Sequence, residues 1–471
     1  DRNTANSSHV INAQSINNST FITDGFSTAN RDNGNINLNF KHTIDSTGRE
    51  INADLDYARF FNSDLQTYNT SYFDLQNNPT QAPYLLFGDL DGSLDIKSAK
   101  IDYGQKLKDG TSVEVGVKSS LVKADNELAF FDRSNGGNVL DANKSNHFLY
   151  DENINALYLN ANKKWAKTGL QVGLRVENTN AKGHQLTTDE RFDNSYTQLF
   201  PSAAFSFKAN KMHDFAISVS RRIDRPTYNQ LNPFKFFLDP STFAAGNPFL
   251  KPQLTYAFEF THTINQKFIA KYSYTHTTAN MLSVLSPAEG ETNVIVQTDR
   301  NLAKFDYYGI TLTMPASIGN WFSSVNNATF YYGLYRGNLA DTNLDAGRPT
   351  INLNSNNTLV LGKSWTAEVS GTYRGQEVYG FLVVKPIAFL SAGVQKQFLD
   401  KKASVKLNVS DMFYSNRVNG STVLSGYEEN FFQKRDARVA TVNFTYRFGK
   451  SQTQPARRRT GGAEEEKRRA N

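Results

Sequence analysis

Alternation of apolar and polar residues with a period of two runs along nearly the whole chain. The segment Thr441–Phe448 alternates in this way, as do Ala403–Ser410 and Leu170–Glu177. A period of two places successive side chains on opposite faces of a β-strand. The same pattern recurs at Ile36–Phe40, Val113–Val117, Phe205–Phe207, Phe215–Val219, Tyr256–Phe260, Phe268–Tyr274, Ile351–Leu353 and Val369–Tyr373. No competing 3.6-residue pattern of useful length interrupts these segments, so the sequence predicts an all-β fold.

The connections between the predicted strands fall into two length classes. Tight turns are predicted at Asp45–Arg49, Lys108–Thr111, Lys163–Thr168, Asn210–His213, Asn265–Lys267, Ser317–Asn320, Gly362–Ser364 and Asp400–Lys402. Long polar loops are predicted at Asn62–Leu94, Lys123–Tyr150, Asp224–Pro252, Met281–Ala303 and Asp411–Phe431. Short turns at one end and long loops at the other are typical of a transmembrane antiparallel β-barrel of the outer membrane, whose periplasmic turns are short.

The turns divide the chain into about 17 strands, and a weaker one near His9–Asn17 makes about 18. A barrel of this size is too wide for side chains to fill, so its polar inward face suits a hydrated lumen. The alternative is that the polar face is the solvated side of an ordinary half-buried sheet. The apolar outward face is expected to contact the lipid bilayer of the outer membrane.

The three tryptophans provide a separate indication. Trp165, Trp321 and Trp365 each fall in or just after a tight turn, and Phe448 closes the last predicted strand. Indole rings prefer the membrane–water interface. We therefore expect these four side chains to form an aromatic girdle at the periplasmic end. The alternative is the buried core tryptophan of a soluble β-protein.

Composition excludes several other classes of protein. No stretch approaches the ~20 apolar residues of a spanning helix, and the chain has no cysteine. The net charge of +6 comes mostly from the last segment, residues 449–471, which holds seven Lys or Arg residues and three Glu. A nearly neutral body with a charged tail does not predict nucleic-acid binding. The tail is predicted to be disordered and periplasmic; an ionic contact with a partner or with lipid headgroups is the alternative.

Catalytic and metal-binding patterns are weak. The seven histidines are scattered, and neither H-E-x-x-H, G-x-S-x-G nor a phosphate-binding loop occurs. We therefore predict neither an enzyme nor a cofactor. Asp341, Asn343 and Asp345 begin like a calcium loop, but the glycine comes one residue late and Asn352 replaces the usual bidentate Glu. Turn formation is the competing reason for this composition.

A patterned segment lies between two predicted strands. It reads Arg225-Pro226-Thr227-Tyr228, then Leu231-Asn232-Pro233-Phe234, then Gly246-Asn247-Pro248-Phe249-Leu250-Lys251-Pro252-Gln253. It resembles the signature of TonB-dependent receptors of the outer-membrane β-barrel family, Bacteroidetes type. Asn408–Phe413 and Thr445–Lys450 also match, and the resemblance covers the chain up to Phe448. Its residues Arg225, Tyr228, Asn232, Phe234 and Asn247 are candidates for ligand contact or for loop architecture, since prolines stiffen the loop.

The resemblance implies active uptake of a nutrient across the outer membrane. It also implies a barrel of 22 strands, a plug domain inside it, an N-terminal region that binds TonB, and in some systems a surface lipoprotein lid. Residues 1–448 then form the barrel, without the plug or the first strands. We expect the chain to be the C-terminal part of a longer receptor, or else a plugless barrel. Two rival hypotheses are a passive porin-like channel and a structural barrel that scaffolds partner proteins.

Overall fold

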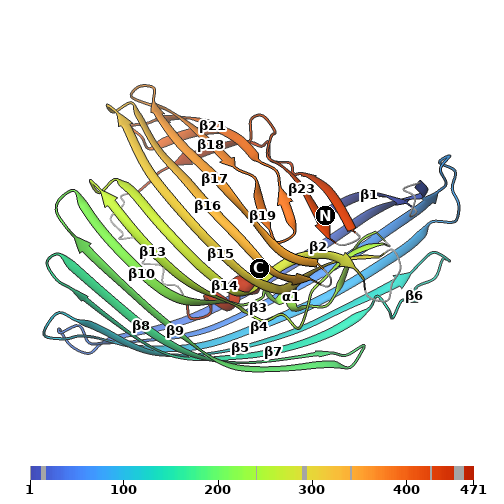
Figure 1. The fold of residues 1–471 in the computed structure, drawn as a ribbon, viewed down its shortest axis with the longest axis horizontal. Helices are drawn as coiled ribbons and strands as arrows, with labels where there is room; N and C mark the ends of the chain where they lie inside the picture. The colour runs from blue at the N-terminus through green and yellow to red at the C-terminus, as the bar shows by residue number, and fades with distance from the viewer. Residues whose placement is uncertain are drawn as a thin grey trace.

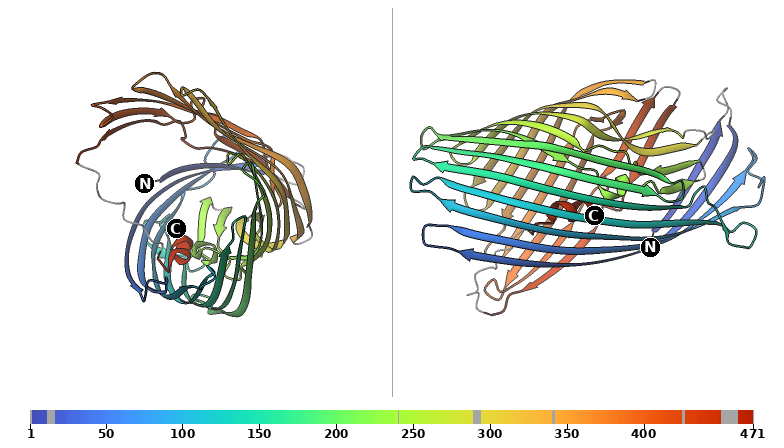
Figure 2. Two further views of the ribbon diagram at one scale, coloured as in Figure 1. Left: turned by 90° about the vertical axis from the view of Figure 1, so that its left-hand side faces the viewer. Right: turned by 90° about the horizontal axis from the view of Figure 1, so that it is seen from below.

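One large antiparallel sheet curls around a central lumen (Figures 1 and 2). The computed structural model describes residues 2–11, 17–239, 241–288, 294–339, 342–424, 427–449 and 461–470. The first half of the wall consists of β1 (Arg2–Ile11), β2 (Asn17–Thr43), β3 (Glu50–Phe73), β4 (Tyr84–Lys106), β5 (Ser112–Asp132), β7 (Asn146–Lys164), β8 (Thr168–Gln185), β9 (Glu190–Lys208) and β10 (His213–Asp224). The second half consists of β13 (Gln253–Ile264), β14 (Phe268–Pro287), β15 (Ile295–Ile318), β16 (Phe322–Leu339), β17 (Thr342–Val360), β18 (Trp365–Arg374), β21 (Ile387–Phe398), β22 (Ala403–Val409) and β25 (Ala440–Tyr446).

Within the described residues, these eighteen wall strands pair in sequence order, each with its neighbours along the chain. This confirms the all-β prediction and the expected number of strands, although the weak first strand lies earlier, at Arg2–Ile11. The outermost strands, β1 and β25, have β2 and β22 as their neighbours in the described sheet. Unpaired edge groups are costly in hydrocarbon, so both outer edges must be covered when the barrel is in a membrane.

Smaller elements lie in the connections. They are β6 (Val139–Leu140), α1 (Tyr228–Leu231), β11 (Lys235–Asp239), β12 (Thr242–Ala245), β19 (Glu377–Tyr379), β20 (Leu382–Val384), β23 (Arg417–Leu424), β24 (Tyr427–Lys434) and α2 (Glu464–Ala470). The strands β19, β20, β23 and β24 form a separate four-stranded sheet. Among the described residues, neither helix is long and apolar enough to cross a bilayer.

The two ends of the barrel differ as the sequence predicts. All eight predicted tight turns lie between paired strands at one end, which we call the turn end; the other is the loop end. At the loop end the strands reach further than expected. β3 runs to Phe73 and β4 begins at Tyr84, so the predicted loop Asn62–Leu94 is mostly strand. The predicted loop Met281–Ala303 likewise contains parts of β14 and β15.

A reversal of polarity along the strands explains this difference. Near the turn end of β8 the outward side chains are apolar, and Leu174 is 46% exposed. Four residues further on the same face carries Asn178, and later Lys182. In β4 the inward face near the loop end is apolar instead, with Leu90 and Ile96 buried, while the outward face carries aspartates such as Asp91. The period of two continues, but its apolar face changes sides where the wall leaves the apolar band.

Candidate functional site

The patterned segment folds inward and occupies the lumen. Residues 225–252, here called the luminal loop, connect β10 to β13, whose ends Asp224 and Gln253 lie directly opposite each other. The loop contains α1 and the hairpin of β11 and β12, and β12 pairs in parallel with β15. Figure 2 shows α1 inside the curve of the sheet. The loop is therefore held by the wall on two sides.

Local interactions fix the first turn of the luminal loop. The backbone N–H of Gln230 donates to the Thr227 hydroxyl at 3.2 Å, and the Gln230 side chain accepts from the Thr227 N–H at 2.8 Å. This reciprocal capping box satisfies amide groups that the start of a helix leaves without partners. The following Pro233 and the preceding Pro226 restrict the backbone on either side of α1.

Aromatic and aliphatic side chains of the luminal loop make an apolar core with the inner wall. Phe234 is 0% exposed, and Tyr228 and Leu231 are also buried. The ring of Phe237 lies edge-on to Phe130 of β5 with centroids 5.4 Å apart. Further buried members of this luminal core are Leu86, Leu90, Leu128, Phe148, Tyr150, Phe243 and Leu250. The apolar inward face of the strands near the loop end thus packs against the luminal loop.

The Gly-Asn-Pro part of the luminal loop is built for close approach. A Cβ on Gly246 would lie 2.1 Å from the carbonyl oxygen of Asn232, so a side chain there would displace backbone. The N–H of Asn247 donates to the Gln230 carbonyl at 2.6 Å. The Asn247 amide also donates to the carbonyl oxygen of Asp299 on β15 at 3.0 Å. These contacts tie the second half of the loop to α1 and to the wall.

Arg225 is the charged centre of the loop. Its side chain is 1% exposed and pairs with Glu177 of β8 and, at 2.7 Å, with Glu465 of α2. It also donates to the hydroxyl of Thr179 at 3.1 Å. Burial opposes the charge of Arg225, but the carboxylates of Glu177 and Glu465 outweigh it and raise its pKa above the usual value. Arg225 therefore stays charged and joins the loop to both the wall and α2.

Residues 461–470 of the charged tail are ordered, which corrects the prediction of disorder for this part. They include α2, which contacts α1 inside the lumen (Figure 2). Glu466 is 0% and Arg469 5% exposed. The prediction of disorder rests on the composition of the tail, and composition does not show that the wall carries complementary charges. Residues 450–460, which join this segment to the barrel, lie outside the described residues.

A cavity of about 370 Å³ lies where the luminal loop, α2 and strands β7–β9 meet. Tyr150, Phe192 and Leu250 provide apolar surface, while Glu152 and Arg469 provide charge. The Arg469 guanidinium donates to Glu152 at 2.6 and 3.1 Å. Two of the charges that line this cavity, Glu152 and Arg469, are thus paired with each other.

The structure brings the five loop candidates of the sequence together. Arg225, Tyr228, Asn232 and Phe234 are buried in the luminal loop, and Asn247 bonds to the same loop. They have architectural contacts, so their role in ligand contact stays a hypothesis. The sequence does not single out the wall residues that bind α2, namely Asp56, Lys118 and Glu152. Their only sequence signal is a charge on the inward face of a strand, which many inward positions share.

The four girdle candidates all lie at the turn end and are exposed. Trp165, Trp321 and Trp365 are 47%, 51% and 42% exposed, and Phe448 follows β25. The ammonium groups of Lys163 and Lys396 lie 5.4 and 5.0 Å from the rings of Trp165 and Trp365. Exposed indoles beside cationic groups suit an interface with lipid headgroups. The girdle remains a proposal that this placement supports.

The calcium candidates do not form a loop in the part that the structure describes. Asn343 and Asp345 lie on the extended strand β17, and Asp345 is 3.8 Å from Arg336. Asp341 lies outside the described residues. Among the described residues, His, Cys, Asp and Glu side chains do not gather in groups of three that could hold a metal ion.

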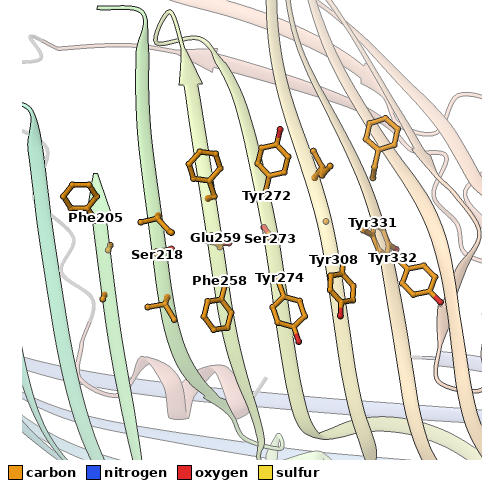
Figure 3. A pocket seen from close by; sticks show the side chains of 18 of the residues that line it. Phe205, Ser218, Phe258, Glu259, Tyr272, Ser273, Tyr274, Tyr308, Tyr331 and Tyr332 are labelled. Carbon is orange, nitrogen blue, oxygen red and sulfur yellow. The ribbon is translucent and has the colours of Figure 1, made fainter. Parts of the chain in front are cut away.

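The outer face holds a wide apolar concavity of about 1130 Å³. Figure 3 shows Phe258, Tyr272, Tyr274, Tyr308 and Tyr332 side by side across β13–β16. Phe258, Tyr272, Tyr308 and Tyr332 are exposed and Tyr274 is half-buried, and all five lie on the outward face, away from α2 and the luminal loop. Rings of Tyr274 and Tyr308 stack with centroids 4.9 Å apart. A continuous aromatic surface of this kind suits contact with lipid rather than with a soluble ligand.

An outward apolar band, a polar inner face, tight turns at one end and a filled lumen define a transmembrane β-barrel of the outer membrane. The family model described as "Outer membrane protein beta-barrel family" matches residues 42–446, and the chain belongs to this family. This confirms the family resemblance and the location in the outer membrane. No curated protein sequence matches the chain.

Solved structures share the fold. The ferric yersiniabactin uptake receptor FyuA from Yersinia pestis aligns with a TM-score of 0.55 at 12% identity, over 95% of this chain and 74% of that one. The ferric-catecholate import receptor Fiu from E. coli K12 aligns with a TM-score of 0.58 at 12% identity, over 91% and 64%. FpvAI in complex with pyocin S2 aligns with a TM-score of 0.54 at 12% identity, over 92% and 56%. The chain therefore spans about half to three quarters of these receptors.

Proposed function

We propose that the protein is a TonB-dependent receptor that imports a nutrient ligand across the outer membrane. The observation that carries the proposal is the luminal loop packed inside the barrel (Figure 2). A passive channel needs a continuous aqueous path, whereas here the luminal loop packs against the inner wall with Phe234 fully buried. A path for the ligand must be opened by movement of the loop, and in this proposal coupling to TonB supplies the energy for that movement.

The fold neighbours support the same hypothesis. Two of them are described as receptors for ferric yersiniabactin and ferric catecholate uptake. Fold likeness at this identity does not identify a ligand. The proposal therefore specifies energy-dependent import and leaves the nutrient to experiment.

The test compares four strains of the source organism: wild type, a deletion of this gene, a deletion of tonB, and the double deletion. The solutes that each strain removes from defined and conditioned media are measured by mass spectrometry. We expect one class of solute to be retained in the medium equally by all three deletion strains. Removal of that solute without TonB, together with steady ion conductance of the purified protein in planar bilayers, would favour the porin hypothesis.

Partner proteins are tested in the same material. Native purification from the outer membrane is expected to retain a surface lipoprotein if a lid covers the loop end. Stable partners without any TonB-dependent solute would instead favour the scaffold hypothesis.

A further inference from the structure

Four of the six charged side chains of α2 each face an opposite charge from a different part of the barrel. Glu466 pairs with Lys118 of β5 at 2.9 Å, and Arg469 pairs with Glu152 of β7 at 2.6 Å. Two further pairs join Glu465 to Arg225 at 2.7 Å and Lys467 to Asp56 of β3 at 3.6 Å. In these four pairs, each acidic residue of the helix faces a basic residue of the barrel, and each basic residue of the helix faces an acidic one.

With α2 in place, its barrel partners are buried. The side chains of Asp56, Glu152 and Lys118 are 0%, 3% and 9% exposed. Charges in such surroundings are unfavourable unless they are paired or hydrated. Together with Arg225 they form what we call the wall site.

The start of the segment fits closely against the same site. The N–H of Gly462 donates to the Asp56 carboxylate at 2.7 Å. A Cβ on Gly461 would lie 2.4 Å from a carboxylate oxygen of Asp56, and Ala463 is 0% exposed. Only a small, glycine-led segment can therefore approach Asp56 this closely.

The contact between α2 and the wall site consists of interactions that can dissociate. A seven-residue helix is not stable alone in water, so α2 needs the wall site in order to form. Most of its contacts are ion pairs in a lumen, where water can solvate both partners after separation. The apolar contribution is small, because Ala463, just before the helix, is the one fully buried apolar side chain of residues 461–470.

The helix also holds the luminal loop. Arg469 donates to the carbonyl oxygen of Pro226 at 2.9 Å, and its guanidinium lies 4.4 Å from the centre of the Tyr228 ring. Glu465 pairs with Arg225 of the same loop. β25 ends at the turn end, whereas α2, later in the chain, contacts a loop that begins at the loop end.

We propose that the wall site is a dissociable binding site for the mixed-charge helix α2, and that bound α2 clasps the luminal loop against the barrel wall. Release of the helix then frees the loop. The proposal rests on the contacts inside the barrel and not on the transport hypothesis, so either can fail without the other.

The first test measures amide hydrogen exchange in the full-length chain, reconstituted in bilayers, for residues 461–470 and for the luminal loop. Arg469→Glu is expected to speed exchange at least ~100-fold in both segments, because it opposes Glu152 with a like charge. Arg469→Glu combined with Glu152→Arg is expected to restore protection by exchanging the two charges. Arg468→Glu is the matched control, since Arg468 is exposed and the change in composition is the same.

The second test asks whether the helix dissociates. A synthetic peptide with the sequence of residues 460–471 is added in excess to the unmodified protein, and a peptide with Arg469→Glu serves as its control. Faster exchange of the protein's own 461–470 segment with the first peptide alone supports the proposal. No effect of the competitor, or equal effects of Arg468→Glu and Arg469→Glu, would overturn it. If protection from exchange is lost in α2 while exchange in the luminal loop is unchanged, the proposal that α2 holds the loop against the wall is wrong.

Discussion

At the scale of single residues, side chains of the luminal loop that are of the same type and close together in the sequence differ in burial. Phe234 and Phe236 are both phenylalanines in the same aromatic stretch, but Phe234 is 0% and Phe236 40% exposed. The first lies in the luminal core with Tyr228 and Leu231. Removal of a fully buried aromatic ring leaves a cavity, whereas removal of a half-exposed ring does not.

We therefore predict that Phe234→Ala loosens the luminal loop. The cost of the cavity is about 3–5 kcal/mol, and it acts mainly on the loop because the wall strands keep their own pairing. The measurement is cleavage of the loop by a protease added to intact cells. Phe236→Ala is the control and should leave the cleavage rate near that of the unmodified protein. Equal rates for the two variants would contradict the placement of Phe234.

At the scale of elements, each wall strand has two zones with opposite polarity. In β8, Leu170, Val172 and Leu174 face outward near the turn end, and Asn178 and Lys182 continue the same face beyond them. An apolar outward face suits lipid, and a polar outward face suits water. The boundary of the membrane therefore crosses β8 between Leu174 and Asn178.

This boundary predicts a sharp difference between two substitutions on one face of one strand. Leu174→Arg is expected to destabilise the folded barrel by ~2–4 kcal/mol, because it places a charge in the lipid-facing band. Asn178→Arg should cost about 0–1 kcal/mol, as expected near or beyond the interface, where Lys182 is already tolerated. Urea titrations of folding into phospholipid bilayers measure both values. Similar costs for the two variants would place the boundary elsewhere.

At the scale of the whole molecule, the luminal loop and α2 occupy space that the curved sheet alone would leave open. Deletion of the luminal loop can test whether it occupies the lumen. The deletion is feasible because Asp224 at the end of β10 and Gln253 at the start of β13 lie directly opposite each other. A two-residue Asn-Gly turn can join strands in that register. The loop can therefore be removed without moving the wall.

We predict that replacing residues 225–252 by Asn-Gly raises ion conductance through the barrel several-fold relative to the unmodified chain in the same planar bilayers. The physical reason is that the luminal core is removed and water takes its place. Heat-modifiable migration in gels checks that the shortened barrel is folded. Unchanged conductance of a folded variant would mean that the loop does not obstruct the lumen.

The strands can be predicted from local sequence, because a period of two depends only on neighbouring residues. Segments such as Thr441–Phe448 and Leu170–Glu177 carry that pattern within a few residues, and the tight turns between strands are equally local. The family resemblance came from the same kind of local signal, in the prolines and asparagines of residues 225–253. These features fixed the fold class and the two ends of the barrel.

The contacts inside the lumen depend on tertiary structure and could not be predicted from local sequence. Predicted loops such as Asn62–Leu94 became strands because their apolar residues face inward, and an inward apolar face is useful only where the luminal loop packs on it. The order of α2 likewise depends on Lys118 and Glu152, which are more than 300 positions away in the sequence. Composition records the charge of the tail but not its partners. Burial and ion pairing join residues that are distant along the chain, and for that reason they emerge only when the barrel is formed.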